Sequence, residues 1–382
     1  MMRIRGLILY FYTLSFIFIS ELNAKNYLLI PKVQSFINSL NRDTKIPKNY
    51  LNKLFKDVKY QQTALSFYNN KIKPLPSKKR FKRCGPRCLE TGSWDRYSFN
   101  LLKASRVKRG KKYMRDYKNT LSKAYKKYGV PPQYITAIIG IESYYGANTG
   151  KYPVFDTLTT LAFESNRRNS FFKKELRAFL IMTYNQKVDP LAVQGSYAGA
   201  IGLGQFMPSN YKKLAIDFDN NGKISLNTNS DAIGSIAHYL KRSGWQRGQE
   251  VAIPVSYFHK KYKAKPTGYR YKYKRVQLRE LRNKRVTNYK GDVYIIKLQR
   301  SKHDELWLGT KNFYVITRYN HSDYYAMAVY QLAQKLIGED VAQAPNVFDK
   351  IVGDSLIKSS DIDLFLDAPL KKNRGRKFII DL

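Results

Sequence analysis

The sequence predicts an α+β protein that is predominantly α-helical and carries a small strand-containing subdomain. Segments such as 157–182 and 229–242 place apolar residues at the three- and four-residue spacing of one helix face. Between Val251 and Val315, short β-like runs instead surround an insert rich in Lys, Arg and Tyr. The 382 residues are 43% hydrophobic, so a sizeable core can form.

The first 24 residues have the layout of a secretory signal peptide. Arg3 and Arg5 precede an uncharged apolar run, Leu7 to Ser20, and Ala24 offers a small residue for cleavage. The run is short for a membrane span, although an uncleaved anchor helix is the alternative. No Cys lies near the cleavage point to carry a lipid. We expect a periplasmic protein, membrane-anchored if the signal is uncleaved.

The chain is strongly basic, with 69 Lys and Arg against 28 Asp and Glu and a formal charge of +41. Such a charge attracts polyanions. Because an exported chain leaves the nucleic acids of the cell behind, we expect no nucleic-acid partner and expect anionic cell-envelope polymers instead. Cys84 and Cys88 flank Gly-Pro-Arg, a spacing that favours a small disulfide loop in an oxidising compartment, with two free thiols as the alternative.

Residues 25–93 are expected to form an N-terminal extension and a linker. Short helical spacing in this region is interrupted by Pro31 and Pro47, and the basic, Pro-containing run 71–87 is typical of an exposed linker. From Trp94 the residue pattern changes to longer segments with helical apolar spacing, and we expect a catalytic domain over 94–338.

Within this domain the helical and strand-like segments alternate. Residues 113–143 predict a helix, a Gly-Val-Pro-Pro break and a second helix that opens on Pro132. Two helical segments are expected in 157–182 and another in 229–242. The β-like runs of the insert at about 251–315 are "VAIPVSYF", "VYIIKLQ" and "FYVIT", and the run "HSDYYAMAVYQLAQKLIG" returns to helix. Residues 339–382 are expected to be a C-terminal extension.

Glu142 is an acid in an otherwise apolar helical stretch. On a helix, Ile135, Ile138, Ile139 and Glu142 share one face, and Gly146 is the expected stop. Partial burial and the negative end of the helix dipole both disfavour the ionised carboxyl. They would raise its pKa toward the range that a general acid needs. The alternative is a Glu at the helix rim that points to solvent.

A second feature is the glycine-rich run from Gln194 to Tyr211. It lacks the Gly-Lys-Ser/Thr ending of a phosphate-binding loop. Its small residues would let the backbone approach a ligand or a helix closely. Ser196 and Gln205 are then its candidate polar groups, with tight helix packing as the alternative reading.

Together these segments resemble the membrane-bound lytic transglycosylase B family of peptidoglycan-cleaving enzymes. The resemblance covers Trp94 to Gly338 in order and with family-like spacing, and it implies a lysozyme-like helical catalytic domain. The pieces that carry it are "YGVPPQYITAIIGIESYYG", "DTLTTLAFESNRR", "GSYAGAIGLGQFMPSNY", "DFDNNGKISLNTNSDAIGSIAHYL" and "NFYVITRYNHSDYYAMAVYQL".

The resemblance implies that Glu142 is the single catalytic residue and that no cofactor is required. It would protonate the glycosidic oxygen between N-acetylmuramic acid and N-acetylglucosamine. It would then act as base while the muramic 6-hydroxyl attacks C1, which leaves a 1,6-anhydro end. Most glycosidases need a second carboxylate, but here the substrate hydroxyl replaces water. The resemblance assigns no catalytic role to Asp156 or Glu164, the nearest downstream acids.

The resemblance also implies residues that bind the glycan strand. They are polar groups in the cleft, two arginines for the peptide stem or sugar, and aromatic rings that stack on sugars: Ser196, Gln205, Arg167, Arg168, Tyr97, Tyr239, Tyr319 and Asn320. With 31 Tyr in the chain, most tyrosines are expected to serve packing.

The loop "DFDNNGKISLNT" is similar to an EF-hand calcium loop. Asp217, Asp219 and Asn221 take positions 1, 3 and 5, and Lys223 would offer its backbone carbonyl at position 7. Thr228 stands at position 12 where the pattern wants Glu. The resemblance implies that Asp231, three residues later, supplies that ligand. The loop 217–231 thus predicts a structural Ca²⁺ site, with a metal-free polar turn as the alternative.

The sequence favours a peptidoglycan lytic transglycosylase over two alternatives. A lysozyme-type hydrolase would use water in place of the 6-hydroxyl. A non-catalytic, basic envelope-binding protein would keep the fold without the reaction.

Overall fold

The computed structural model describes residues 24–69, 92–255, 265–278, 289–301 and 304–339. The expected signal sequence before Ala24, the Cys84–Cys88 pair and its basic linker, and nearly all of the C-terminal extension lie outside these residues. Within these ranges, none of the helices is both long enough and apolar enough to cross a membrane.

The N-terminal segment forms a helical layer of its own. Its elements are β1 (Ala24–Lys25), η1 (Tyr27–Leu29), α2 (Pro31–Asp43), α3 (Lys48–Lys56), β2 (Val58–Lys59) and α4 (Gln62–Ser66). The two prolines that interrupt the apolar spacing mark helix starts, because α2 begins on Pro31 and Pro47 caps α3. A missing N–H costs nothing at a helix start.

This layer shares a hydrophobic core with α11 (Val154–Phe163) and α12 (Asn169–Asn185). Rings such as Phe55 and Phe155 meet edge to face in this core, with centroids 5.2 Å apart. Residues 24–69 are therefore packed against the helices expected for the catalytic domain. Where that domain begins stays a prediction.

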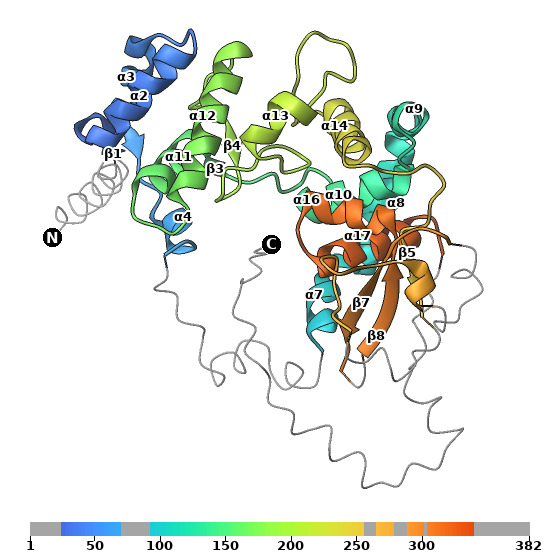
Figure 1. Cartoon of the computed structure of the whole chain (residues 1–382). Helices are drawn as coiled ribbons and strands as arrows, with labels where there is room; N and C mark the ends of the chain where they lie inside the picture. The colour runs from blue at the N-terminus through green and yellow to red at the C-terminus, as the bar shows by residue number, and fades with distance from the viewer. Residues whose placement is uncertain (1–23, 70–91, 256–264, 279–288, 302–303, 340–382) are drawn as a thin grey trace, which may run out of the picture.

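The remaining helices surround a larger core in which α10 lies at the centre. They are α7 (Ser93–Leu101), α8 (Ala104–Asp116), α9 (Lys118–Tyr128), α10 (Pro132–Ser143), α13 (Pro208–Leu214), α14 (Asn229–Arg242), α16 (Lys311–Tyr319) and α17 (Asp323–Leu336). Helix α10 contacts α8, α9, α14 and α17. Figure 1 shows α8, α9, α10, α16 and α17 on one side of the molecule and α2, α3, α11 and α12 on the other, with α13 between α12 and α14.

A four-stranded antiparallel sheet supports the larger core from below (Figure 1). The strands run in the order β5 (Ala252–Pro254), β8 (Asp304–Gly309), β7 (Val293–Gln299) and β6 (Lys272–Tyr273), with η3 (Arg275–Leu278) beside them. Alternate residues of β7 face opposite sides. Ile296 and Leu298 join the larger core, whereas Val293 and Ile295 join a small core with Leu278. A two-residue pair, β3 (Tyr152–Pro153) and β4 (Gln194–Gly195), joins distant loops.

The predicted elements agree with the structure in most places and fail in two. Helix α14, strand β7 and the start of α10 at Pro132 lie where the sequence predicted them. The expected strand "FYVIT" is wrong, because it lies in α16. The Thr310 side chain accepts from the Asn312 N–H and starts that helix. The helix expected from residue 113 is also interrupted at Tyr117, between α8 and α9.

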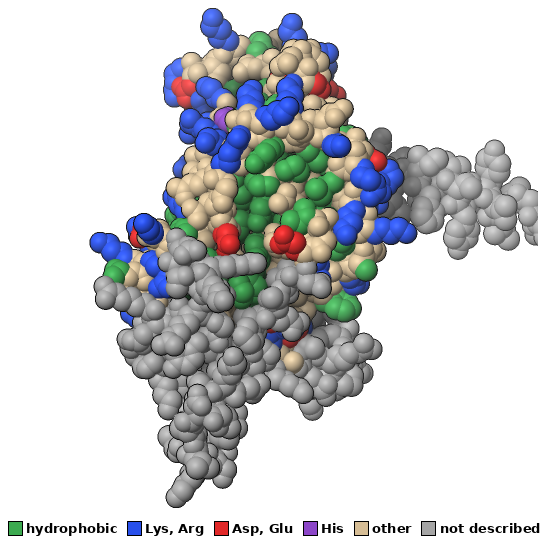
Figure 2. Space-filling view, turned by 90° about the vertical axis from the view of Figure 1, so that its right-hand side faces the viewer, with side chains coloured by type: hydrophobic (Ala, Val, Ile, Leu, Met, Phe, Trp, Pro, Cys, Tyr) green, Lys and Arg blue, Asp and Glu red, His purple; other side chains and the backbone are tan. Residues whose placement is uncertain are grey.

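The surface is basic, as the composition requires. In Figure 2, Lys and Arg side chains lie around an area of apolar side chains, with few acids among them. The described residues thus retain the positive character of the whole chain.

Candidate active site

Helix α10 carries Glu142 into the middle of the larger core. Pro132 stands in the first turn of α10, and the residues of this helix are buried on almost every side. Ile135, Ile138 and Ile139 are fully buried. A helix that is apolar all round belongs inside a protein. The structure therefore places Glu142 on the apolar face that the spacing predicted.

The Glu142 carboxyl is held by a tyrosine from a distant helix. Tyr325, on α17, donates its hydroxyl to Glu142 Oε1 at 2.6 Å. Burial is the largest influence and raises the pKa of Glu142 to about 7, while the Tyr325 hydrogen bond lowers it. Residue Glu142 as a whole is intermediate between buried and exposed. A carboxyl with these properties can give and take a proton near neutral pH.

The turn after Glu142 differs from the expected one. The helix ends at Ser143, and Tyr144 and Tyr145 adopt left-handed backbone conformations with φ of 51° and 60°. The predicted stop at Gly146 is therefore wrong by two residues. Such a conformation costs a non-glycine residue roughly 1 kcal/mol or more. The guanidinium groups of Arg106 and Arg109 both lie 4.9 Å from the Tyr144 ring and support it.

Three of the predicted sugar-binding tyrosines gather around this site. The Tyr319 ring stacks on that of Tyr325 at 6.4 Å, and Tyr239 lies 4.8 Å from Tyr319. Tyr97 stacks on Trp94, and its hydroxyl is buried without a hydrogen-bond partner among the described residues. Burial first, and the Glu142 charge second, raise the pKa of both Tyr97 and Tyr319. Both hydroxyls therefore stay neutral.

Sequence reasoning did not identify Tyr325 as a site residue. It stands in the quoted run "HSDYYAMAVYQL", but nothing local distinguishes it from the other tyrosines. It is 183 positions from Glu142. Only the packing of α10 against α17 brings the two together.

The glycine-rich run forms a compact loop beside this cluster. The Ser196 hydroxyl accepts from the N–H groups of Ala198 and Ala200 and so shapes the loop. Gln205 uses its amide nitrogen on the carbonyls of Thr149 and Gly202, both at 2.9 Å. Its Oε1 remains as an acceptor for a ligand. The sequence allowed two interpretations of the glycine-rich run, tight packing and close approach to a ligand, and one loop can serve both.

The loop also touches the tyrosines directly. The Gly204 carbonyl accepts from the Tyr319 hydroxyl. A Cβ on Gly204 would stand 2.8 Å from that oxygen. Glycine is needed here for close approach, and Asn320, which follows Tyr319, caps the end of α16 next to it.

The two predicted arginines lie beside the core that the N-terminal layer shares with α11 and α12, called the second core below. Arg167 and Arg168 are exposed at the start of α12. The Arg168 guanidinium lies 4.2 Å from the Phe171 ring and 6.0 Å from the Tyr68 ring. Neither ring belongs to the group of tyrosines around Glu142.

The nearest downstream acids are occupied elsewhere. Asp156 is buried and accepts from the Lys59 N–H at 3.1 Å, and burial raises its pKa to about 6. Glu164 pairs with Lys25 at 2.7 Å. Both connect the N-terminal layer to α11 and the residue that caps it.

The EF-hand-like loop brings three carboxylates together. Oxygens of Asp217, Asp219 and Asp231 lie within 4.8 Å of one another. Asp231 is buried and also accepts from the N–H groups of Phe218 and Ser225, at 2.8 and 2.7 Å. Three carboxylates fit the oxygen ligands that calcium prefers.

The rest of the loop has the geometry of a turn. The Asn221 side chain accepts from the Lys223 N–H at 2.8 Å, and Gly222 has a φ of 82°. Desolvation of Asp217 opposes ionisation, but the hydrogen bonds from Gly222 and Asn221 together outweigh it and lower the pKa of Asp217. Asp217 is therefore ionised and able to bind a cation.

Comparisons with known proteins agree on one family. The family described as "Transglycosylase SLT domain" matches residues 30–334. Membrane-bound lytic murein transglycosylase B of Escherichia coli is 36% identical over 306 residues, which are 80% of this chain and 82% of that protein.

Two solved structures share the fold. The Escherichia coli lytic transglycosylase Slt35 in complex with calcium has a TM-score of 0.70 and 34% identity, and the match covers 80% of this chain and 93% of that chain. Soluble lytic transglycosylase SltB1 of Pseudomonas aeruginosa has a TM-score of 0.69 and 36% identity, and the match covers 80% and 98%.

Proposed function

Because this chain belongs to the transglycosylase SLT domain family, and is thus a peptidoglycan lytic transglycosylase, we propose that Glu142 is its single general acid and base. One observation carries the proposal. Burial raises the pKa of Glu142 to about 7 while Tyr325 donates to its carboxyl, and the residue as a whole is not fully buried. A general acid must be protonated at working pH and must be able to ionise once.

The reaction then needs one carboxyl and no added water. Protonated Glu142 gives its proton to the glycosidic oxygen as the bond to C1 breaks. The resulting carboxylate, stabilised by the Tyr325 hydroxyl at 2.6 Å, takes the proton of the muramic 6-hydroxyl as that oxygen attacks C1. The products are an anhydromuramic end and a free sugar hydroxyl, and the enzyme regains its proton.

Other residues would hold the glycan strand. Tyr97, Tyr239 and Tyr319 offer rings near Glu142, on which sugar C–H faces stack. Gln205 offers its Oε1, and Ser196 and Asn320 add polar groups at the loop and the end of α16. Arg167 and Arg168, exposed at the start of α12, are suited to the carboxylates or carbonyls of a peptide stem.

The test is digestion of purified sacculi followed by mass spectrometry of the products. Wild-type protein should release fragments with anhydromuramic ends. Glu142→Gln should still bind sacculi but release at least about a thousandfold less, because removal of a general acid removes the proton transfer. Glu164→Gln, which changes an acid paired with Lys25, should keep wild-type activity.

Each alternative function predicts a different result. Reducing ends alone would identify a lysozyme-type hydrolase. Sacculus binding without any release by the wild type would identify a non-catalytic envelope protein. Equal activity of Glu142→Gln and wild type would refute the site.

We propose that a calcium ion bound in the loop 217–231 has a structural role. Asp217, Asp219 and Asp231 would hold it, with the Lys223 carbonyl and the Asn221 side chain as further oxygen donors. The calcium-containing structure of the Escherichia coli relative supports the choice of ion. Bound calcium would neutralise three converging carboxylates and stabilise the loop, and the reaction does not pass through it.

The relative's name supports an envelope location. We propose that residues 1–24 direct export to the periplasm and that anionic envelope polymers attract the basic chain. Mass spectrometry of the mature N-terminus in envelope fractions tests the first point. A chain that retains Met1 there would show that the segment is an anchor.

A further inference from the structure

A basic pocket lies on the opposite side of α10 from Glu142. It is an open surface pocket of about 580 Å³ between α8, the turn after α10 and the first residue of α14. One acid lines it, Asp116, and it pairs with Lys112 at 2.6 Å. The basic side chains that line it are Lys108, Arg109, Lys112 and Arg115. The pocket is therefore suited to an anion.

A directed chain of hydrogen bonds forms its polar wall. Tyr113 donates its hydroxyl to Asn229 Oδ1 at 2.7 Å, and Asn229 Nδ2 donates to the Tyr117 oxygen at 2.8 Å. Every proton in this chain points the same way. The Tyr117 O–H is left at the end of it, as a donor for an acceptor in the pocket.

The wall is also aromatic. The Tyr113 and Tyr117 rings lie 4.6 Å apart, and Tyr145 lies 5.7 Å from Tyr113. The Lys and Arg groups of the pocket and the Tyr117 hydroxyl can bind a carboxylate, and the tyrosine rings beside them can contact the apolar part of a peptide. They recognise both the charge and the apolar part of such a ligand.

The position of the pocket points to a polymeric ligand. The Tyr145 ring fits between Gly110 of α8 and Gly140 of α10. Gly140 and Glu142 are two residues apart, which places them about 200° apart around the helix. Tyr145 follows Glu142 by three residues, so at most about 10 Å of backbone separates them. A ligand of this pocket lies close to the reaction but outside it.

We infer that this pocket is an exosite that binds the carboxylate-bearing peptide stems of polymeric peptidoglycan. The inference rests on the proposed function, because the polymer that such an enzyme holds beside Glu142 is its own substrate. The site is distinct from Arg167 and Arg168, which lie with the second core.

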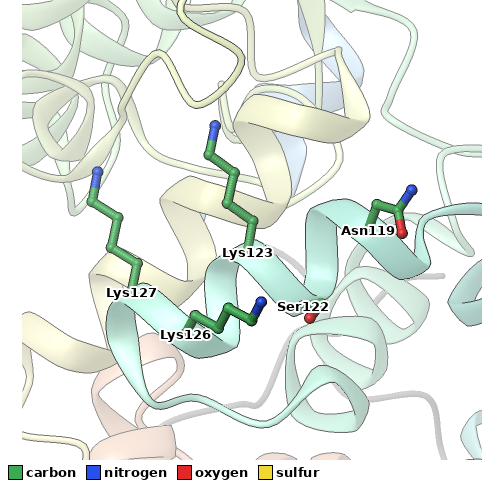
Figure 3. Close-up of a pocket in the computed structure, with 5 residues that line it drawn as sticks. All are labelled: Asn119, Ser122, Lys123, Lys126 and Lys127. Atoms are coloured by element: carbon green, nitrogen blue, oxygen red, sulfur yellow. The ribbon is translucent and has the colours of Figure 1, made fainter.

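The experiment compares two pairs of exposed bases on the consecutive helices α8 and α9. Lys108→Gln/Arg115→Gln removes two charges from the pocket. Lys126→Gln/Lys127→Gln removes two from α9, where Figure 3 shows both lysines on the surface of that helix. Tyr117→Phe removes the donor, and Tyr125→Phe on α9 is its control. All are assayed by co-sedimentation with glycan strands that carry their stems and with strands from which the stems have been removed.

Wild-type protein should bind stem-bearing strands more tightly than stripped strands. The double pocket variant should lose roughly threefold to tenfold in affinity for stem-bearing strands only, and Tyr117→Phe roughly twofold to fivefold. The α9 variants should keep the preference. Added salt should weaken the preference, since exposed charges carry it.

Three results would overturn the exosite. One is a preference that survives in the double pocket variant. Another is an equal loss in the α9 variant, which would mean that charge acts without a site. The third is a pocket variant that loses binding to anionic phospholipid vesicles but not to stem-bearing strands. Cleavage of stripped strands by wild type is recorded separately, so its absence would refute the proposed function and not the pocket.

Discussion

At the scale of single residues, two opposing effects determine the properties of Glu142. Burial disfavours its charged form, and the hydrogen bond from Tyr325 favours it. Burial wins, which leaves a pKa of about 7. At neutral pH an exposed Glu would be ionised and could not act as an acid. In the proposed reaction, the hydroxyl of Tyr325 would offset part of the cost of the charge formed on Glu142.

Replacement of Tyr325 by Phe should therefore change the pH profile. Loss of the hydrogen bond removes a contact that lowers the pKa of Glu142, so that pKa should rise further. The protonated form is the active acid, so activity is lost as pH rises through this pKa. In Tyr325→Phe that limb of kcat/KM should move to higher pH, and the maximum should fall about tenfold.

The control is Tyr324→Phe, at the neighbouring position. The Tyr324 hydroxyl bonds Ser93 at 2.6 Å and does not contact Glu142. Its pH profile should match that of wild type. A limb that stays in place or moves to lower pH in Tyr325→Phe would contradict the assigned role.

At the scale of elements, short β-contacts join the loops around the site. Strands β3 and β4 pair Tyr152 with Gly195, so the segment after Glu142 is tied to the glycine-rich loop. Gly150 has a φ of 96°, and a Cβ there would stand 2.1 Å from the Gly195 carbonyl oxygen. The pairing thus depends on glycine at position 150.

Gly150→Ala should cost about 2–4 kcal/mol of unfolding free energy and reduce activity, because strain and a backbone clash act together. Gly248→Ala is the matched control. It has a φ of 75°, but nothing lies within 4 Å of the added Cβ, so only the strain of about 1 kcal/mol applies. Chemical denaturation and sacculus digestion measure both. Equal costs for the two variants would show that the close approach to Gly195 contributes nothing.

At the scale of the whole molecule, the helices are divided between two hydrophobic cores. One is the core that the N-terminal layer shares with α11 and α12, and the other is the larger core around α10. The EF-hand-like loop belongs to the larger one, because Phe218, between Asp217 and Asp219, packs in that core and under Gly234 of α14. A metal in this loop would act on the stability of the larger core. It would not change the chemistry at Glu142.

Calcium should therefore raise the unfolding temperature. At ten to a hundred times its dissociation constant, binding stabilises the folded state by about 1.4–2.7 kcal/mol. Asp219→Asn should abolish this increment with little effect on the metal-free protein. Asp231→Asn should also weaken the metal-free protein, since Asp231 accepts two backbone N–H groups. Thermal unfolding with calcium or a chelator measures the shift, and an identical midpoint in both would exclude the site.

Local signals in the sequence were enough for much of this protein. The spacing of apolar residues and the position of Pro132 predicted α10 and the face that carries Glu142, and alternation predicted β7. They succeed because these features depend on neighbours along the chain. The three carboxylates of the loop 217–231, which the structure brings together, lie within one turn and the helix that follows, and their use as calcium ligands stays a prediction.

Only the tertiary structure decided the rest. "FYVIT" has the β-branched composition of a strand, yet the Thr310 cap and burial against α14 and α17 make it helix α16. Tyr325 is one tyrosine among 31 in the sequence. It acquires its role because α17 packs against α10 and places its hydroxyl 2.6 Å from Glu142. A pKa depends on every atom around the group, and those atoms come from segments that the sequence keeps far apart.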